Sequence, residues 1–209
     1  MLKFFRETRQ NMLSKNKLSG YLIYAIGEIL LIAVGIFMAL QLQNWNETRK
    51  TAEVTQQTLE RIKKEVVANQ KQIDNVYDYH IMVRDTLNKI EAPKTEEEAG
   101  KSLGFWRGLR IFRLSDAAFQ TAIQSGVSKD INANLMENLN SLYTSQEEYN
   151  DLSKTASQSL YSKDFTDFKN FKNIAVFLNM TMVDLYYFES GLKKQFTTCL
   201  QKIDSINTK

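Results

Sequence analysis

The 209-residue sequence contains one cysteine, one proline, one histidine and eight glycines. A single cysteine, Cys199, excludes both an intramolecular disulfide and a metal site built from several cysteines, and we expect it to be a small buried residue. With so little proline and glycine, the chain lacks the turn residues that a β-rich fold requires. Because helix-favouring residues dominate the rest, the sequence predicts an all-α fold.

The sequence also lacks the patterns that carry catalytic or cofactor chemistry. It has no glycine-rich phosphate loop, no Cys-x-x-Cys or His-x-x-x-His pair, and no Gly-x-Ser-x-Gly motif. The one histidine, His80, is expected to be a packed or interfacial residue, with pH sensing and metal ligation as the alternatives. We therefore predict no catalytic residue, no cofactor, no bound metal and no enzyme activity.

Positive charge is concentrated at the start of the chain. From Glu47 onward the acidic and basic residues are equal in number, so the sequence shows no basic face for nucleic acid, and we predict no nucleic-acid partner. Residues 1–19 mix apolar and basic side chains, which favours a short amphipathic segment on an anionic membrane surface. The basic residues of this segment are Lys3, Arg6, Arg9, Lys15 and Lys17.

A long apolar stretch follows at 21–42, where only Glu28 and Gln41 are polar enough to interrupt it. About 20 residues suffice to cross the hydrocarbon core of a bilayer, so we predict a transmembrane helix at 20–45, with lipid as its first partner. The stretch is too long for a cleaved signal peptide. Aromatic residues that suit the two membrane interfaces lie at its ends: Tyr21, Tyr24 and Trp45.

The charges that flank this stretch predict its orientation. Five basic residues precede it, whereas the residues just after it carry balanced charge. By the positive-inside rule, the N-terminus is expected in the cytoplasm and residues 46–209 on the opposite side of the membrane.

The sequence YAIGEILLIAVGIFMALQLQNWNE at 24–47 resembles a group of uncharacterised single-pass membrane proteins of Bacteroidota. In that group a Gly-Glu pair opens the span and an Asn-Trp-Asn-Glu motif closes it. A second and looser similarity covers LSDAAFQTAIQSG at 114–126. The resemblance implies a Gram-negative inner membrane and a periplasmic domain, in a group that has no assigned activity.

Beyond the membrane, residues recur in steps of three and four, as in the seam of a coiled coil. We predict that the membrane helix continues to about Lys89, through a stalk at 46–92, and stops before Pro93. Asn69 and His80 occupy polar seam positions of the kind that specify register. The full seam is Leu59, Ile62, Val66, Asn69, Ile73, Val76, His80, Val83, Leu87 and Ile90.

The remaining residues, 93–209, are predicted to form an extracytoplasmic antiparallel helical bundle that the distal stalk completes. Two interpretations of the seam stay open, because either the chain's own later helices or the stalk of another subunit can fill it. The expected segments are an exposed loop at 93–100, a short helix or aromatic packing segment at 102–114, a helix through 124 capped by Ser115 or Asp116, a helix from 131 to about 152 capped by Ser128 or Asp130, and a last helix at 174–206.

Glu28 is the most informative residue of the anchor. An ionised carboxylate inside the membrane costs roughly 2.5 to 3.5 kcal/mol or more, so we expect it to be protonated or paired against another protein surface. Ile32, Gly35 and Ala39 share its helix face, and the small pair Gly35-x-x-x-Ala39 permits close helix contact. The alternative interpretation makes Glu28 a carboxylate that relays protons or ions.

The sequence therefore predicts a structural or interaction protein that self-associates through its anchor and stalk and presents a periplasmic bundle to an envelope partner. A homo-oligomer or a larger membrane complex is the expected assembly. The alternatives are a periplasmic sensor that signals through a partner, with an unknown small-molecule ligand, and an ion-coupled subunit that uses Glu28.

Overall fold

The computed structural model describes residues 18–91, 93–163 and 167–207, and in these residues the regular elements are helices, with no strand. The all-α prediction is therefore confirmed. By internal contacts the chain divides into two compact units, residues 1–53 and 54–209. The predicted topology-setting residues, Lys3, Arg6, Arg9, Lys15 and Lys17, lie outside the described residues.

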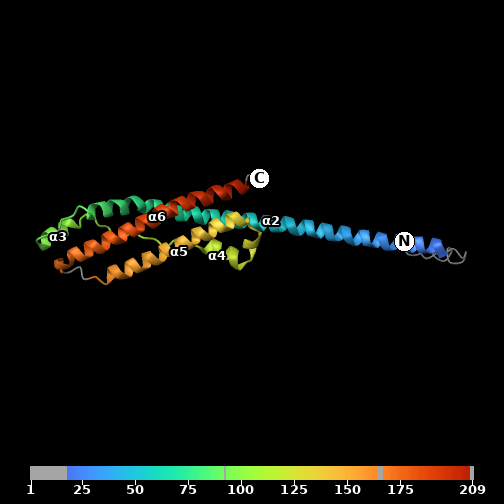
Figure 1. Cartoon of the computed structure of the whole chain (residues 1–209), viewed down its shortest axis with the longest axis horizontal. Helices are drawn as coiled ribbons and strands as arrows, with labels where there is room; N and C mark the ends of the chain where they lie inside the picture. Colours follow the sequence, from blue (N-terminus) through green and yellow to red (C-terminus); the bar gives the residue numbers. More distant parts are fainter. Residues whose placement is uncertain (1–17, 92, 164–166, 208–209) are drawn as a thin grey trace. The chain divides into compact units, whose positions relative to one another are not determined.

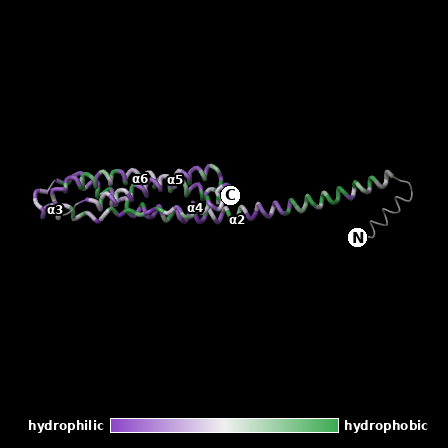
Figure 2. The backbone as a smooth tube through the Cα atoms, turned by 90° about the horizontal axis from the view of Figure 1, so that it is seen from below, coloured by the Kyte–Doolittle hydropathy of each residue, from purple (hydrophilic) through white to green (hydrophobic). Residues whose placement is uncertain are grey.

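The first long element is α2, a helix of 70 residues from Leu18 to Leu87. Neither proline nor glycine occurs between Ile36 and its last residue, so nothing in that stretch breaks the backbone hydrogen-bond ladder. It ends two residues before the predicted end near Lys89, in a turn closed by a bond from Asn88 N to Arg84 O. Figure 2 shows that hydrophobic residues dominate the first part of this helix, whereas polar and apolar residues alternate in its second part.

In unit 2, the second part of α2 lies beside α6, which runs from Phe171 to Asn207 (Figure 1, Figure 2). Asn179, near the start of α6, donates to Asn88 just beyond the end of α2, at 3.0 Å. Farther along α6, Ser190 lies 2.9 Å from the hydroxyl of Tyr77. Residues later in α6 therefore contact residues earlier in the chain around α2.

The third long helix is α5, from Ala133 to Tyr161, which packs closely against α6. Gln195 of α6 donates to Ser145 at 3.1 Å, and Lys202 donates to Asn134 at 2.7 Å. These contacts also run in opposite order along the two helices. Ile174, Leu178, Leu185, Leu192 and Phe196 of α6 are buried between the other elements.

The seam predicted on α2 is buried within unit 2. From Leu59 to Leu87 each predicted seam residue is at most 7% exposed, including the polar Asn69 and His80. Ile90 differs, because it lies beyond the end of the helix and is only half-buried. The chain's own elements therefore fill the seam from Leu59 onward.

Two predictions for the shorter elements were wrong, and a third was settled between its two alternatives. The expected loop at 93–100 contains a helix, α3 at Glu96–Ser102, whose N-cap Thr95 accepts a hydrogen bond from Glu98 N. Of the two alternatives for 102–114, the packing segment is correct, because the chain is irregular from Trp106 onward and its aromatic residues Phe105 and Trp106 pack against the core. Neither Ser128 nor Asp130 caps α5, because both lie in the short helix η1 at Val127–Asp130 and the cap is Asn132.

The other short elements are α4 at Ala117–Gln124 and η2 at Phe168–Asn170. Helix α4 ends close to where the sequence predicts it, at the C-cap Ser125. Gly126 follows with a φ of +75°, a left-handed conformation that glycine adopts without strain.

Replacing Ile62 by alanine tests whether the seam is filled within the chain. Ile62 is fully buried, so its truncation leaves a cavity, and we expect the free energy of unfolding to fall by about 2 to 5 kcal/mol. Val67→Ala on the same helix is the control, since Val67 is 46% exposed and its truncation should change stability by no more than about 0.5 kcal/mol. Denaturant unfolding in mild detergent measures both. Equal effects of the two substitutions would contradict intramolecular burial of the seam.

Candidate functional site

An irregular segment from Trp106 to Asp116 is the most unusual feature of unit 2. Its side chains Leu109 and Leu114 are buried in the core cluster together with residues of α2, α5 and α6. A buried backbone without helix or sheet partners must find other hydrogen bonds for its N–H and C=O groups. In this segment many of the partners are side chains of the surrounding helices.

Asn69 and Tyr79 of α2 bind this segment near its two ends. Asn69 Nδ2 donates to the carbonyl of Ser115 at 2.7 Å, and Ser115 N donates back to Asn69 Oδ1 at 3.0 Å. The hydroxyl of Tyr79 accepts from Arg107 N at 2.9 Å and donates to the carbonyl of Gly108 at 2.8 Å. Each side chain thus satisfies one backbone donor and one backbone acceptor.

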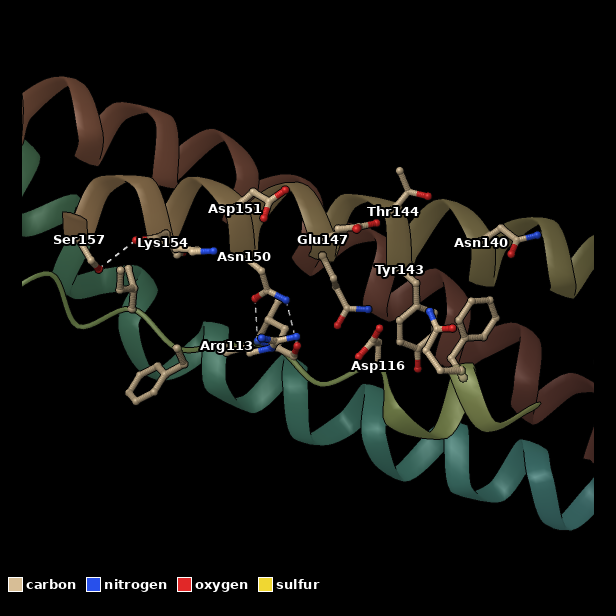
Figure 3. Close-up of a pocket in the computed structure, with 17 residues that line it drawn as sticks. Arg113, Asp116, Asn140, Tyr143, Thr144, Glu147, Asn150, Asp151, Lys154 and Ser157 are labelled. Carbon is tan, nitrogen blue, oxygen red and sulfur yellow. Dashed lines mark hydrogen bonds between the residues drawn. The ribbon is translucent and has the colours of Figure 1, made fainter. Parts of the chain in front are cut away.

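Asn150 of α5 binds the same segment from the other side. Its Oδ1 accepts from Leu114 N at 2.8 Å, and its Nδ2 donates to the Leu114 carbonyl at 3.0 Å (Figure 3). Since neighbouring residues of an extended chain direct their polar groups to opposite sides, Leu114 pairs with α5 and Ser115 pairs with α2. The two asparagines therefore fix the position of this segment between the helices.

His80 anchors the middle of the segment through a fully buried polar network. Its Nε2 lies 2.7 Å from the Leu109 carbonyl, which can only accept, so Nε2 carries a proton. Its Nδ1 lies 2.8 Å from Oε1 of Glu189, which also accepts a bond from the hydroxyl of Tyr149 at 3.3 Å. The contact between Nδ1 and the carboxyl group requires a further proton, carried either by the ring or by Glu189. The network thus connects α2, α5 and α6 to the carbonyl of Leu109 through buried side chains.

Glu65 of α2 organises the start of α4. Its carboxylate accepts from Ala118 N at 2.9 Å and from the hydroxyl of Ser115 at 2.7 Å, and it accepts from the hydroxyl of Tyr143 at 2.8 Å. A carboxylate is favourable at a helix N-terminus, where backbone N–H groups lack partners. The predicted cap Asp116 occupies the N-cap position without a side-chain capping bond.

A groove of 530 Å³ lies beside the segment, between Ile111–Leu114, the start of α4 and one face of α5 (Figure 3). Its lining carries two cationic and three acidic side chains and several amides. Gln146, which is buried, lines it with an Nε2 that has no hydrogen-bond partner within residues 18–91, 93–163 and 167–207. The groove thus offers charges of both signs and one unpaired buried donor to a polar ligand. Its charged residues are Arg113, Lys154, Asp116, Glu147 and Asp151.

In the apolar part of α2, the predicted interface residues Glu28, Ile32, Gly35 and Ala39 are all exposed. No other part of the chain that the structure describes covers them, and a Cβ added at Gly35 would meet nothing within 4 Å. Among the predicted membrane-interface aromatics, Trp45 is 65% exposed and Tyr24 is half-buried, whereas the side chain of Tyr21 is outside the described residues.

Sequence reasoning identified Asn69 and His80 as special but missed Glu65, Asn150 and Glu189. A signal for part of the site was present in α5, where Gln146 and Ser153 interrupt an otherwise apolar stripe at helical spacing. Polar residues in such a stripe are buried with it and need partners. Their partners come from segments far away in the sequence, so the spacing alone could not name them.

Within residues 18–91, 93–163 and 167–207, no three His, Cys, Asp or Glu side chains are grouped so as to hold a metal ion. No family model matches this chain, and neither the curated proteins nor the solved structures contain a match to it. The resemblance to the Bacteroidota group therefore stays a prediction.

Loss of the Asn150 side chain should release the irregular segment from α5. Asn150→Ala leaves both backbone groups of Leu114 without their partner, so we expect a loss of about 1 to 3 kcal/mol in stability. Trypsin should then cleave faster after Arg107, Arg110 or Arg113, which mass spectrometry of the fragments measures. Asn140→Ala, an exposed groove residue of the same helix, is the control and should leave the cleavage rate unchanged. Unchanged cleavage in Asn150→Ala would contradict this role.

Alkaline pH should destabilise unit 2. Burial raises the pKa of Cys199 from 9.0 to about 11, and burial, reinforced by nearby carboxylates, raises the pKa values of Tyr143 and Tyr149 above the ordinary 10.0. Above the unfolded-state pKa values of these groups, the folded chain holds more protons than the unfolded chain. Their contribution to stability is therefore fully present below about pH 9 and is lost as pH rises through about 11.

Thermal unfolding in detergent between pH 8 and 11 measures this effect. Tyr143→Phe removes one of the raised groups and should flatten the decline. A melting temperature that rises across this range would contradict the assignment.

Proposed function

We propose that this chain is a non-enzymatic membrane-anchored interaction protein, which self-associates through its anchor and presents a helical bundle to a partner in the cell envelope. The observation that carries the proposal is the exposure of the apolar part of α2. Within the described residues, α2 is the one helix long and apolar enough to cross a membrane, and the chain buries none of that apolar stretch. Lipid is the natural cover for apolar side chains such as Ile29 and Leu31, which are 66% and 74% exposed.

We infer a cytoplasmic N-terminus and a periplasmic unit 2 in a Gram-negative inner membrane. The basic residues before the span support this orientation through the positive-inside rule. The resemblance of residues 24–47 to the Bacteroidota group supports the compartment. In this proposal unit 2 is an antiparallel bundle, in keeping with the opposite order of the contacts that α6 makes with α2 and α5.

The proposed self-association uses the anchor face of Glu28, Ile32, Gly35 and Ala39. Small residues let two helices approach closely in lipid, and a carboxyl group on the same face gives an interhelical hydrogen bond. The stalk contributes less than the sequence suggests, because the seam is filled within the chain from Leu59 onward. In this proposal the part of the stalk that extends the interface from the anchor is residues 46–58, which are exposed or half-buried.

A second candidate function is a sensor that signals through a partner. The groove beside the irregular segment favours it, because Gln146 Nε2 is a buried donor that a ligand oxygen would satisfy. The groove also touches residues 111–114, so a ligand there would contact the segment that Asn69 and Asn150 hold. An ion-coupled subunit that uses Glu28 is the third possibility, and nothing in the contacts of Glu28 favours it over the interface role.

Gly35→Leu tests the anchor proposal. The larger side chain prevents close helix approach, so we expect the dimer fraction in mild detergent, measured by sedimentation or by energy transfer between labelled chains, to fall strongly. Gly27→Leu is the matched control, since it makes the same change about 100° around the helix from the proposed face. A monomeric wild-type chain, or an equal effect of both substitutions, would overturn the proposal. Normal assembly with lost ion-dependent activity in Glu28→Gln would favour the ion-coupled alternative.

A further inference from the structure

The outer face of the first half of α6 carries an apolar stripe that none of the described residues of unit 2 covers. Val176, Met180 and Tyr187 are 52%, 63% and 69% exposed, and Val183 between them is half-buried. Their spacing of four, three and four residues places them in a single row along the helix. We call these four residues the α6 stripe.

The α6 stripe lies opposite the buried face of the helix. Buried residues such as Leu178 and Leu185 are about half a turn away from it, and the polar contacts to α2 and α5 come from the two sides, for example through Asn179 and Gln195. Packing within the bundle therefore does not explain why these four positions are apolar.

In the second half of the same helix, the residues on this outer face are those expected of a surface exposed to water. There the face carries Lys194, Thr198, Gln201 and Ser205, which are all exposed and polar. In the first half, between Asn173 and Leu192, the charged residues of α6 are Asp184 and the fully buried Glu189. An exposed helical face of several turns with one charge is typical of a contact surface.

We propose that the α6 stripe packs against the same stripe of a second copy of this chain, with the two helices parallel and in register. In a parallel pair each stripe residue meets its own counterpart, so a row of apolar residues at three-four spacing is self-complementary. The flanking positions carry no like charges opposite each other, because Asp184 lies across from Asn179 of the second copy. Two copies anchored in one membrane by the same N-terminal helix have the matching direction.

The small size of the α6 stripe means that the contact between two copies requires association of their anchors. Four side chains per copy fall well below the roughly 800 Å² per partner that a stable free interface buries, so the isolated contact is weak. Confinement by self-associated anchors raises the local concentration of the second copy, and a weak contact then becomes populated. The inference therefore rests on the proposed self-association of the anchor and extends it to unit 2.

Site-directed cross-linking of the full chain in native membranes tests the contact. The only native cysteine, Cys199, is buried, so an added cysteine is the main reactive thiol. Met180→Cys should give a disulfide-linked dimer on mild oxidation, at several times the yield of Thr155→Cys, which places a cysteine at an exposed position of α5. No dimer, equal yields, or a conjugate to a protein of another mass would overturn the proposal.

A charge substitution separates this contact from the anchor contact. Met180→Glu places two carboxylates opposite each other in a parallel pair, so we expect the dimer to weaken by more than about tenfold, with Thr155→Glu as the control. An unchanged melting temperature shows that the exposed substitution leaves the fold intact.

The Gly35→Leu substitution distinguishes failure of the anchor proposal from failure of the α6 contact. If the anchor proposal is wrong, Gly35→Leu leaves the dimer fraction of the chain unchanged. If the α6 stripe is not a contact, Gly35→Leu still lowers the dimer fraction, but Met180→Cys never gives a cross-link above its control.

Discussion

Unit 2 depends on satisfying the backbone of the irregular segment that runs between α2 and α5. Leu109 and Leu114 contribute to the same core as the three long helices, and burying them brings backbone polar groups into the interior. A helix or a sheet would satisfy these groups internally, but this segment depends largely on side chains of the neighbouring helices. Bonds from Asn69, Tyr79, His80 and Asn150 are among them, so the order of the segment depends on the exact placement of two different helices.

This dependence also gives the bundle its register. Apolar contacts between helices tolerate small shifts along the axis, whereas hydrogen bonds of 2.7 to 3.0 Å do not. Asn69 illustrates the point, because it bonds to Ser115 and also donates to Gln146 Oε1 of α5 at 2.5 Å. A polar residue in an apolar seam lowers the stability that hydrophobic packing would give, but it penalises every register in which its partners are missing. His80 and Glu189 impose the same condition between α2 and α6.

The long helices were predictable from sequence because their signals are local. The absence of proline and glycine after Ile36 and the three-four spacing from Leu59 predict one helix with one buried face, and the structure contains both. Helix α3 was missed although Thr95 and Glu98 form a recognisable capping pattern, because its acidic composition resembles a loop. The path of residues 106–116 could not be predicted, since the partners of its backbone lie 28 to 46 positions away. The cap of α4 is equally remote, because Glu65 is 53 positions from Ala118.

The most informative residues of this chain are those whose polarity does not match the medium around them. In the apolar part of α2, side chains such as Leu31 are exposed, and lipid is their proposed surrounding. Glu28 is the residue of this stretch whose charge lipid disfavours. On the outer face of α6 the surrounding is water, and Met180 and Tyr187 are the residues that water does not favour. The two exceptions are opposite in polarity, yet a protein surface that covers the residue resolves both. A second copy can supply that surface at both places, whereas an unrelated partner would have to match two faces of opposite character.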